Sequence, residues 1–201
     1  MSMKRIIGLT GGIGTGKSTV SNYLASIHRL PVLDADVYAR VAVQPGSPVL
    51  SQIAERYGAG VLLSDRTLNR RRLGEIVFSN PAERRWLEEQ IHPYVRDRFL
   101  AELDALEAQQ YPTVVLVVPL LFEAGMTDLV TEIWVVYCSK EQQMQRLMER
   151  ERLSLEQAQA RINSQMPIEE KRDLASIVLD NSSTLESLIK QVDLALKTPN
   201  Y

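Results

Sequence analysis

A glycine-rich stretch near the start of the chain has the residue types and spacing of a phosphate-binding loop. Residues 11–19 read GGIGTGKST and match the pattern GxxxxGK[ST]. Glycines allow the backbone to curl so that successive N–H groups point inward, and a helix beginning there adds the positive end of its dipole. Because an apolar run precedes the loop and a helical pattern follows it, a phosphate cradle is favoured over a plain flexible turn.

The loop is predicted to bind a nucleoside triphosphate, and its residues have different parts in this binding. Lys17 is a mobile cation for the β- and γ-phosphates, and the Ser18 hydroxyl is a ligand for Mg²⁺. The residues predicted to contact the triphosphate are Gly12, Gly14, Thr15, Gly16, Lys17, Ser18 and Thr19. The motif alone does not indicate what receives the phosphate.

A pair of aspartates marks the next place where chemistry is expected. Asp34 and Asp36 directly follow a short apolar run at residues 30–33. Residues i and i+2 of an extended chain point to the same side, so the pair can serve Mg²⁺ and a substrate hydroxyl. Phosphoryl transfer needs cations and a metal on the phosphates and a carboxylate to orient or deprotonate the acceptor. Helix capping is the alternative for both residues, and a capping residue can also contact a ligand.

Two signatures of nucleotide-driven switches and motors are missing from the sequence. It contains no Asn-Lys pair, so the Asn-Lys-x-Asp motif with which GTPases read guanine is absent. The apolar run at residues 114–118 ends in Pro119, where a typical ATPase has an acid, and the nearest carboxylate is Glu123. Both absences argue against a switch or a motor.

Composition limits the class of protein. The 201 residues suffice for one domain with a core, and a hydrophobic share of 45% is ordinary for a globular protein. A net charge of -2 argues against a nucleic-acid partner. No apolar run approaches the roughly 20 residues that span a bilayer. The single cysteine, Cys138, fits a reducing compartment, so we expect a cytoplasmic protein without a membrane partner.

Hydrophobic patterning predicts the elements that position the loop and the aspartates. Five apolar runs are expected to be strands, at residues 5–10, 30–33, 113–118, 133–137 and 177–179. Helical patterns occur at residues 18–27, 49–78, 82–108, 140–162 and 185–196. Strands separated by helices predict an α/β domain with a doubly wound, parallel five-stranded sheet.

The order and spacing of several motifs resemble those of the dephospho-CoA kinase family. Besides residues 10–19 and the triplet Asp34-Ala35-Asp36, the matching stretches are QPGSP (44–48), LNRRRL (68–73), IHP (91–93) with Arg96, VPLLFE (118–123), QxxRxxxR (143–150), RIxxQ (161–165) and DNS (180–182). The loop pattern alone is widespread, whereas this combination is specific and covers nearly the whole chain. The chain departs from the family at Ser176, where Asp is frequent, and at Ser183, where Gly is frequent.

The resemblance implies one P-loop kinase domain built from three parts. These are a nucleotide-binding core (about 1–36, 110–138 and 173–201), a helical substrate-binding insertion (about 37–109) and a helical lid (about 139–172). The implied reaction is ATP-dependent phosphorylation of the ribose 3′-hydroxyl of dephospho-CoA, the last step of CoA synthesis. ATP and Mg²⁺ are the expected cofactors and dephospho-CoA the expected small-molecule partner. A monomer or a weak homo-oligomer is expected.

The resemblance also implies roles for individual residues. Asp36 is the expected general base, and Asp34 is the second choice or a helper near Mg²⁺, directly or through water. Lys17 and Arg146 stabilise the transferring phosphoryl group, and Arg150, four residues from Arg146 on the same helix face, binds ATP. The expected substrate-binding residues are Asp36, His92, Arg96 and Glu123.

Each of these assignments has a structural alternative. Residues 66–98 contain eight arginines and no lysine, which suits a diphosphate but also describes a solvated helix surface. The lid arginines can instead pair with Glu141, Glu149 or Glu151. His92 can be a packed residue and Glu123 a helix start. For the whole chain, the alternatives are another small-molecule or nucleotide kinase and a nucleotide-binding module without turnover.

Overall fold

The computed structural model describes residues 5–198, apart from the side chains of residues 78 and 79. The chain forms two compact units. We call residues 5–34 with 105–198 the core unit, and Ala35–Asp104 the inserted unit. Each unit is described by itself, beginning with the core unit, which carries the glycine loop.

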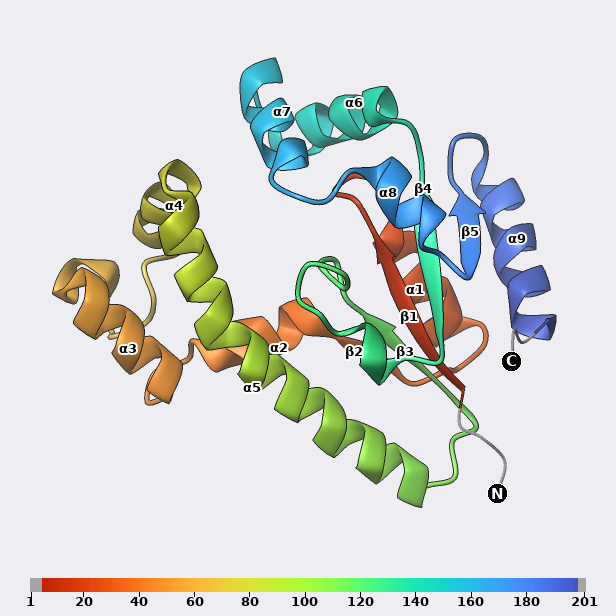
Figure 1. Ribbon diagram of the computed structural model, residues 1–201, viewed down its shortest axis with the longest axis horizontal. Helices are drawn as coiled ribbons and strands as arrows, with labels where there is room; N and C mark the ends of the chain where they lie inside the picture. Colours follow the sequence, from red (N-terminus) through yellow and green to blue (C-terminus); the bar gives the residue numbers. More distant parts are fainter. Residues whose placement is uncertain (1–4, 199–201) are drawn as a thin grey trace. The chain divides into compact units, whose positions relative to one another are not determined.

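The core unit contains a five-stranded parallel sheet with the strand order β2-β3-β1-β4-β5 (Figure 1). Its strands are β1 (Arg5–Gly11), β2 (Val32–Asp34), β3 (Thr113–Val117), β4 (Glu132–Tyr137) and β5 (Ile177–Asp180). The predicted doubly wound sheet is therefore confirmed. The second strand was expected at residues 30–33, and it lies slightly later because pairing with β3 begins at Val32.

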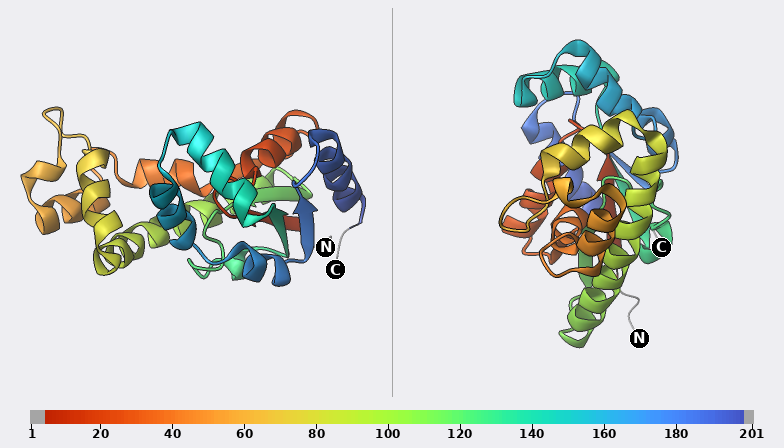
Figure 2. Two further views of the ribbon diagram at one scale, coloured as in Figure 1. Left: turned by 90° about the horizontal axis from the view of Figure 1, so that it is seen from above. Right: turned by 90° about the vertical axis from the view of Figure 1, so that its left-hand side faces the viewer.

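Two helices far apart in the sequence cover the sheet of the core unit. They are α1 (Lys17–Ser26) and α9 (Leu185–Lys197), which lie side by side in Figure 2. Leu24 of α1 and Val192 of α9 are fully buried in one apolar cluster with Trp134 of β4. Burial of these apolar side chains stabilises the packing of both helices on the sheet. This packing fixes the positions of the strand ends.

Three helices lie between β4 and β5: α6 (Lys140–Glu151), α7 (Leu155–Asn163) and α8 (Ile168–Asp173). The helical pattern predicted at residues 140–162 forms two helices, α6 and α7, instead of one. Arg152 has a left-handed backbone with φ of 55° and ends α6. Ser154 then caps α7 by accepting a hydrogen bond from the N–H of Gln157, so a new helix begins in another direction.

The inserted unit is helical, with α2 (Ala35–Ala42), α3 (Pro48–Tyr57), the short 3₁₀ helix η1 (Ala59–Val61), α4 (Arg70–Ser79) and most of α5 (Pro81–Ala108). The predicted break at Asn80 and Pro81 is confirmed. Residues 49–78 are mainly helical, as expected, with an interruption between α3 and α4 where Gly58 and Arg66 adopt positive φ, before Asn69 caps a new helix. An apolar cluster that includes Ile53, Leu68 and Leu73 joins these helices.

Within residues 5–198, none of the helices combines the length and the apolar character that crossing a bilayer requires.

Candidate active site

The glycine loop connects β1 to α1 at the carboxyl end of β1, as the pattern predicts (Figure 1). Gly16 precedes the helix with a left-handed backbone, φ 101°. A Cβ atom there would lie 2.3 Å from Nδ2 of Asn181, and one on Gly12 would lie 2.4 Å from Oε1 of Gln143. A side chain at either position would therefore displace the end of the amide side chain that packs against it. Gly16 also needs glycine because its φ is positive.

Two side chains of the loop donate hydrogen bonds to carbonyl oxygens of the same loop. The Thr15 hydroxyl donates to the carbonyl of Gly12 at 2.9 Å, and Thr15 is fully buried. The Lys17 ammonium donates to the carbonyls of Gly11 at 2.9 Å and Gly12 at 2.8 Å. The lysine therefore lies across the mouth of the loop. The Thr15 side chain is structural, and the Thr15 N–H donates to the carbonyl of Gly12 at 3.4 Å, so Thr15 holds the loop in shape.

Three backbone N–H groups at the loop and the helix start have no protein acceptor. Those of Gly14, Gly16 and Ser18 make no hydrogen bond to any of the residues 5–198. Successive N–H groups in a turn that leads into a helix form a concave anion site, and the helix dipole strengthens it. With the Lys17 charge beside them, this arrangement suits a polyphosphate.

Side chains from three later segments support the loop from outside. Asn181, directly after β5, donates from Nδ2 to the carbonyl of Thr15 at 2.8 Å. Gln165, after α7, accepts from the N–H of Ile13 at 2.9 Å. Gln143 of α6 is almost fully buried against Gly12. Sequence reasoning assigned these three residues no role, and their membership in the QxxRxxxR, RIxxQ and DNS motifs was the signal available.

We expect Asn181→Ala to weaken ATP binding without unfolding the protein. Loss of one hydrogen bond to the loop backbone removes about 0.5–1.5 kcal/mol, which corresponds to an increase of about 3- to 10-fold in KM for ATP. Ser183→Ala, in the same exposed loop, is the matched control. Steady-state kinetics and thermal unfolding measure both effects, and equal KM values for the two variants would contradict the supporting role.

Arg146 and Arg150 both lie on α6, but their side chains have different partners. The Arg146 guanidinium donates to the carbonyl of Asn181 at 2.8 Å and to that of Gly14 at 3.5 Å, so it lies against the glycine loop. Arg150 is 59% exposed and pairs with Glu151 at 2.6 Å. The position of Arg146 suits a contact to phosphate, whereas Arg150 makes the surface ion pair that was its alternative.

The buried thiol of Cys138 reports the local electrostatics. Burial raises the pKa of Cys138, while the nearby charges of Arg146 and Lys17 act in the opposite direction. The carboxylate of Asp180 also raises this pKa. The thiol itself lies next to the carbonyl of Gly14 and packs against the loop.

Glu123, an expected substrate ligand, is held within the core unit. Its carboxylate accepts from the N–H of Met166 at 2.9 Å and pairs with the ammonium of Lys171 at 2.8 Å. Lys171 of α8 is fully buried and also donates to the carbonyl of Pro119 at 2.9 Å. This cluster ties α8 to the segment after β3, a role that neither expectation for Glu123 included.

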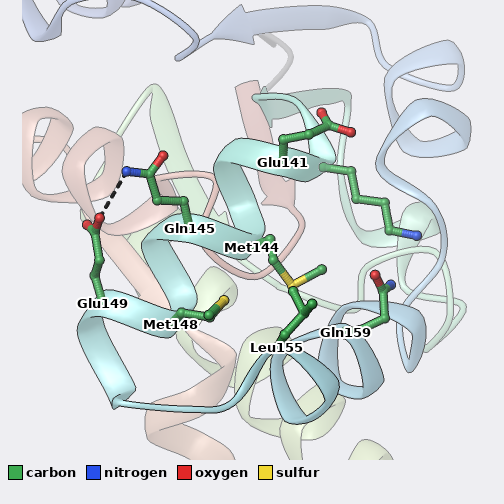
Figure 3. A pocket seen from close by; sticks show the side chains of 8 residues that line it. Glu141, Met144, Gln145, Met148, Glu149, Leu155 and Gln159 are labelled. Atoms are coloured by element: carbon green, nitrogen blue, oxygen red, sulfur yellow. Dashed lines mark hydrogen bonds between the residues drawn. The ribbon is translucent and has the colours of Figure 1, made fainter.

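The two cavities lined by α6 and α7 differ in their relation to the loop. One, of about 230 Å³, is lined by Gly12, Gln143 and Gln165 among others and adjoins the loop. The other, of about 570 Å³, lies between the helices, where Met144, Met148 and Leu155 point toward one another (Figure 3). None of the predicted site residues lines this larger cavity, so its volume does not identify the site.

The aspartate pair does not have the geometry that the sequence suggested. Asp34 is the last residue of β2, and α2 begins at Ala35, so the chain between the aspartates is not extended. The argument that both side chains point to one side of a strand is therefore wrong. Asp36 occupies the first turn of α2, where the helix dipole favours its charge.

In the inserted unit, Asp36 lines a cavity of about 340 Å³. Leu87 and Ile91 of α5 form part of its wall, whereas His92 and Arg96 do not line it. His92 is half-buried, and desolvation lowers its pKa against the opposing charge of Glu88. The ring is therefore mostly neutral near pH 7, which suits a packed or hydrogen-bonding residue better than a cation for phosphate.

Nearly the whole chain is similar to known proteins. A family model described as dephospho-CoA kinase matches residues 5–187. A dephospho-CoA kinase of Trichormus variabilis is 65% identical over 193 residues, which cover 96% of this chain and 97% of the relative. The matched region contains the glycine loop, both aspartates and Arg146.

Solved structures resemble this one over almost their full length. A Thermus thermophilus protein has a TM-score of 0.80 and 38% identity, covering 98% of this chain and 99% of that one. The dephospho-CoA kinase from Campylobacter jejuni has a TM-score of 0.72 and 29% identity, covering 97% and 96%. Fold and sequence therefore lead to the same group of proteins.

Proposed function

The chain belongs to the dephospho-CoA kinase family, and from this we propose how its residues divide the work of the reaction. The enzyme transfers the γ-phosphoryl group of ATP to the ribose 3′-hydroxyl of dephospho-CoA and releases CoA and ADP. The observation that carries the assignment of the ATP site is the set of unpaired N–H groups beside Lys17.

We propose that the glycine loop holds the β- and γ-phosphates. The N–H groups of Gly14, Gly16 and Ser18 bind phosphate oxygens, and the Lys17 ammonium moves from the loop carbonyls to the γ-phosphate. Arg146, which already lies against Gly14, adds a second positive charge. These cations oppose the charge that develops as the bond to the leaving oxygen breaks. Arg150 pairs with Glu151, so binding of ATP by Arg150 requires the guanidinium to exchange this partner for phosphate.

Asp36 is proposed as the general base. Its carboxylate accepts the proton of the 3′-hydroxyl as that oxygen bonds to the γ-phosphorus, and ADP leaves with the bridging oxygen. The support is its place in a cavity that also contains arginine side chains. We propose that His92 and Arg96 bind the substrate. We propose the same for Glu123, which also pairs with Lys171 of α8.

Ser18 and Asp34 suit Mg²⁺. The Ser18 hydroxyl is exposed and has no hydrogen-bond partner within the described residues, and Asp34 ends β2 in the same unit. No cluster of three or more His, Cys, Asp or Glu occurs within residues 5–198. A small number of oxygen ligands is what Mg²⁺ bound mainly to phosphates requires. When bound, it would neutralise charge on the β- and γ-phosphates.

The remaining proposals concern organisation. We propose that the core unit binds ATP, that the inserted unit binds dephospho-CoA, and that α6 and α7 form a lid that excludes water. We also propose a cytoplasmic enzyme, monomeric or weakly self-associating, with no nucleic-acid partner. The single free cysteine and the net charge of -2 support the compartment and the lack of a nucleic-acid partner.

The assay that tests the function compares ADP release from ATP and Mg²⁺ with and without dephospho-CoA. We expect release that depends on the acceptor and yields one CoA for each ADP. Release that ignores dephospho-CoA would indicate an ATPase. Transfer to another alcohol in preference to dephospho-CoA would favour a different small-molecule kinase, and no release at all would favour a binding module.

A further inference from the structure

The cavity of the inserted unit combines an aliphatic interior with a charged rim. Its interior is lined by Val43, Leu68, Leu73, Leu87 and Ile91. The first three are buried, and the other two are partly buried in the same apolar cluster. The charged residues of the lining are Asp36, Arg40 and Arg70, and all three are exposed. Such a site suits an elongated ligand with an anionic part followed by an apolar part.

The two rim arginines differ from several other arginines of the inserted unit. Arg56, Arg72, Arg84 and Arg98 each pair with a glutamate. Arg40 and Arg70 have no ion pair or hydrogen bond to any described residue. Their guanidinium groups are therefore available to an external anion, and a diphosphate matches the paired donors of arginine.

Helix α2 arranges the three kinds of lining residue in order. Asp36, Arg40 and Val43 follow one another at spacings of four and three residues, so they lie along one face of the helix or its immediate continuation. At 1.5 Å per residue, Arg40 lies about 6 Å and Val43 about 10 Å along the axis from Asp36. The face thus presents a carboxylate, then a cation, then an apolar side chain.

The acceptor carries its chemical groups in the same order. In dephospho-CoA the ribose bears the reacting hydroxyl, the 5′-diphosphate follows, and the branched, gem-dimethyl start of the pantetheine arm is attached directly to the diphosphate. We propose that Arg40 and Arg70 bind this diphosphate and that the aliphatic interior takes the gem-dimethyl segment, which places the ribose hydroxyl at Asp36. This inference rests on the proposed function and deepens it.

The chemistry of the interior favours the branched chain over the adenine ring. Proteins bind a nucleobase by stacking it on aromatic or guanidinium groups and by hydrogen bonds to its edge. The lining residues of the interior are aliphatic, without an aromatic or amide side chain. A branched alkyl group needs only such apolar contact.

The first experiment tests the rim. We expect Arg40→Ala and Arg70→Ala each to raise KM for dephospho-CoA about 10-fold while KM for ATP stays within about twofold. Arg71→Ala is the matched control, because Arg71 neighbours Arg70 on α4, is exposed and does not line the cavity. All three side chains are on the surface, so the variants should fold, and thermal unfolding checks this.

The second experiment separates the diphosphate from the branched chain. Its acceptors are dephospho-CoA and the β-methyl ester of adenosine 5′-diphosphate, which keeps the ribose and the diphosphate charge but lacks the arm. Ile91→Thr keeps the β-branch of a half-buried residue and replaces apolar surface with a hydroxyl. It should raise KM for dephospho-CoA about fivefold and leave KM for the ester unchanged. The Arg40→Ala and Arg70→Ala variants should raise KM for both acceptors.

The outcomes distinguish this inference from the proposed function. If the unaltered enzyme phosphorylates dephospho-CoA but both arginine variants behave like Arg71→Ala, the diphosphate assignment is wrong and the kinase assignment stands. If Ile91→Thr weakens the ester as much as dephospho-CoA, the gem-dimethyl assignment is wrong. Failure of the unaltered enzyme to phosphorylate dephospho-CoA would overturn both the inference and the function on which it rests.

Discussion

Replacement of Lys17 with alanine should lower kcat by about 10²- to 10³-fold. The reason is the loss of the positive charge nearest to the phosphoryl group in transfer, an effect of the size seen when one transition-state donor is removed. The structure places the ammonium at hydrogen-bond distance from the carbonyls of Gly11 and Gly12, so it is already at the loop. Single-turnover measurement at saturating ATP isolates the chemical step from binding.

The fold should tolerate this change. Lys17 is partly exposed and donates to the backbone carbonyls of Gly11 and Gly12, so we expect the loss of these hydrogen bonds to lower the free energy of unfolding by about 1 kcal/mol. Lys17→Arg keeps the charge and should retain more activity than Lys17→Ala. Lys190→Ala, which removes an exposed lysine paired with Glu186 on α9, is the control. Unchanged turnover in Lys17→Ala would show that the lysine does not serve the phosphates.

Replacement of Asp36 with asparagine should lower kcat by about 10²-fold or more. The amide keeps the shape of the carboxylate but cannot accept the proton of the acceptor hydroxyl. KM for ATP should change little, because the loop residues that we propose to bind ATP belong to the core unit, whereas Asp36 belongs to the inserted unit. Initial rates with dephospho-CoA and equilibrium binding of an ATP analogue measure the two effects separately.

Two further substitutions make this test specific. Asp97→Asn changes an exposed aspartate on α5 and should leave kcat and KM unchanged. Asp34→Asn should instead raise the Mg²⁺ concentration needed for half-maximal rate. If Asp36→Asn retains near-normal turnover while Asp34→Asn abolishes it at saturating Mg²⁺, Asp34 is the base and the assignments must be exchanged.

The sequence alone was sufficient to predict the position of the glycine loop between a strand and a helix, and the class of fold. The strand, the glycines and the helix that follow one another at residues 5–26 are local features, so a short pattern determines them. Continuous apolar runs predicted a sheet buried on both faces because parallel strands are covered by helices. The boundaries of β2 and the break between α6 and α7 were less well predicted, because they depend on pairing with β3 and on one left-handed residue, Arg152.

The residues around the loop were determined only by the tertiary structure. Asn181 reaches the carbonyl of Thr15 across 166 positions of the chain, and Gln165 reaches Ile13 across 152. Local patterns carry no information about such partners, because the arrangement of the sheet and its helices brings them together. The buried Lys171 pairs with Glu123 for the same reason, and no role was assigned to Lys171 from the sequence.

The residues proposed to bind dephospho-CoA were likewise determined partly by sequence and partly by tertiary structure. The sequence contains Asp36 and many arginines, but every arginine looks alike until the helices pack. Packing gives Arg56 a glutamate partner and places Arg40 and Arg70 at the rim of an aliphatic cavity. The sequence by itself thus determined which reactive side chains are available and the local turn that we propose to bind phosphate. Tertiary structure selected the side chains that face a ligand, because burial and long-range contacts decide which charges are already neutralised.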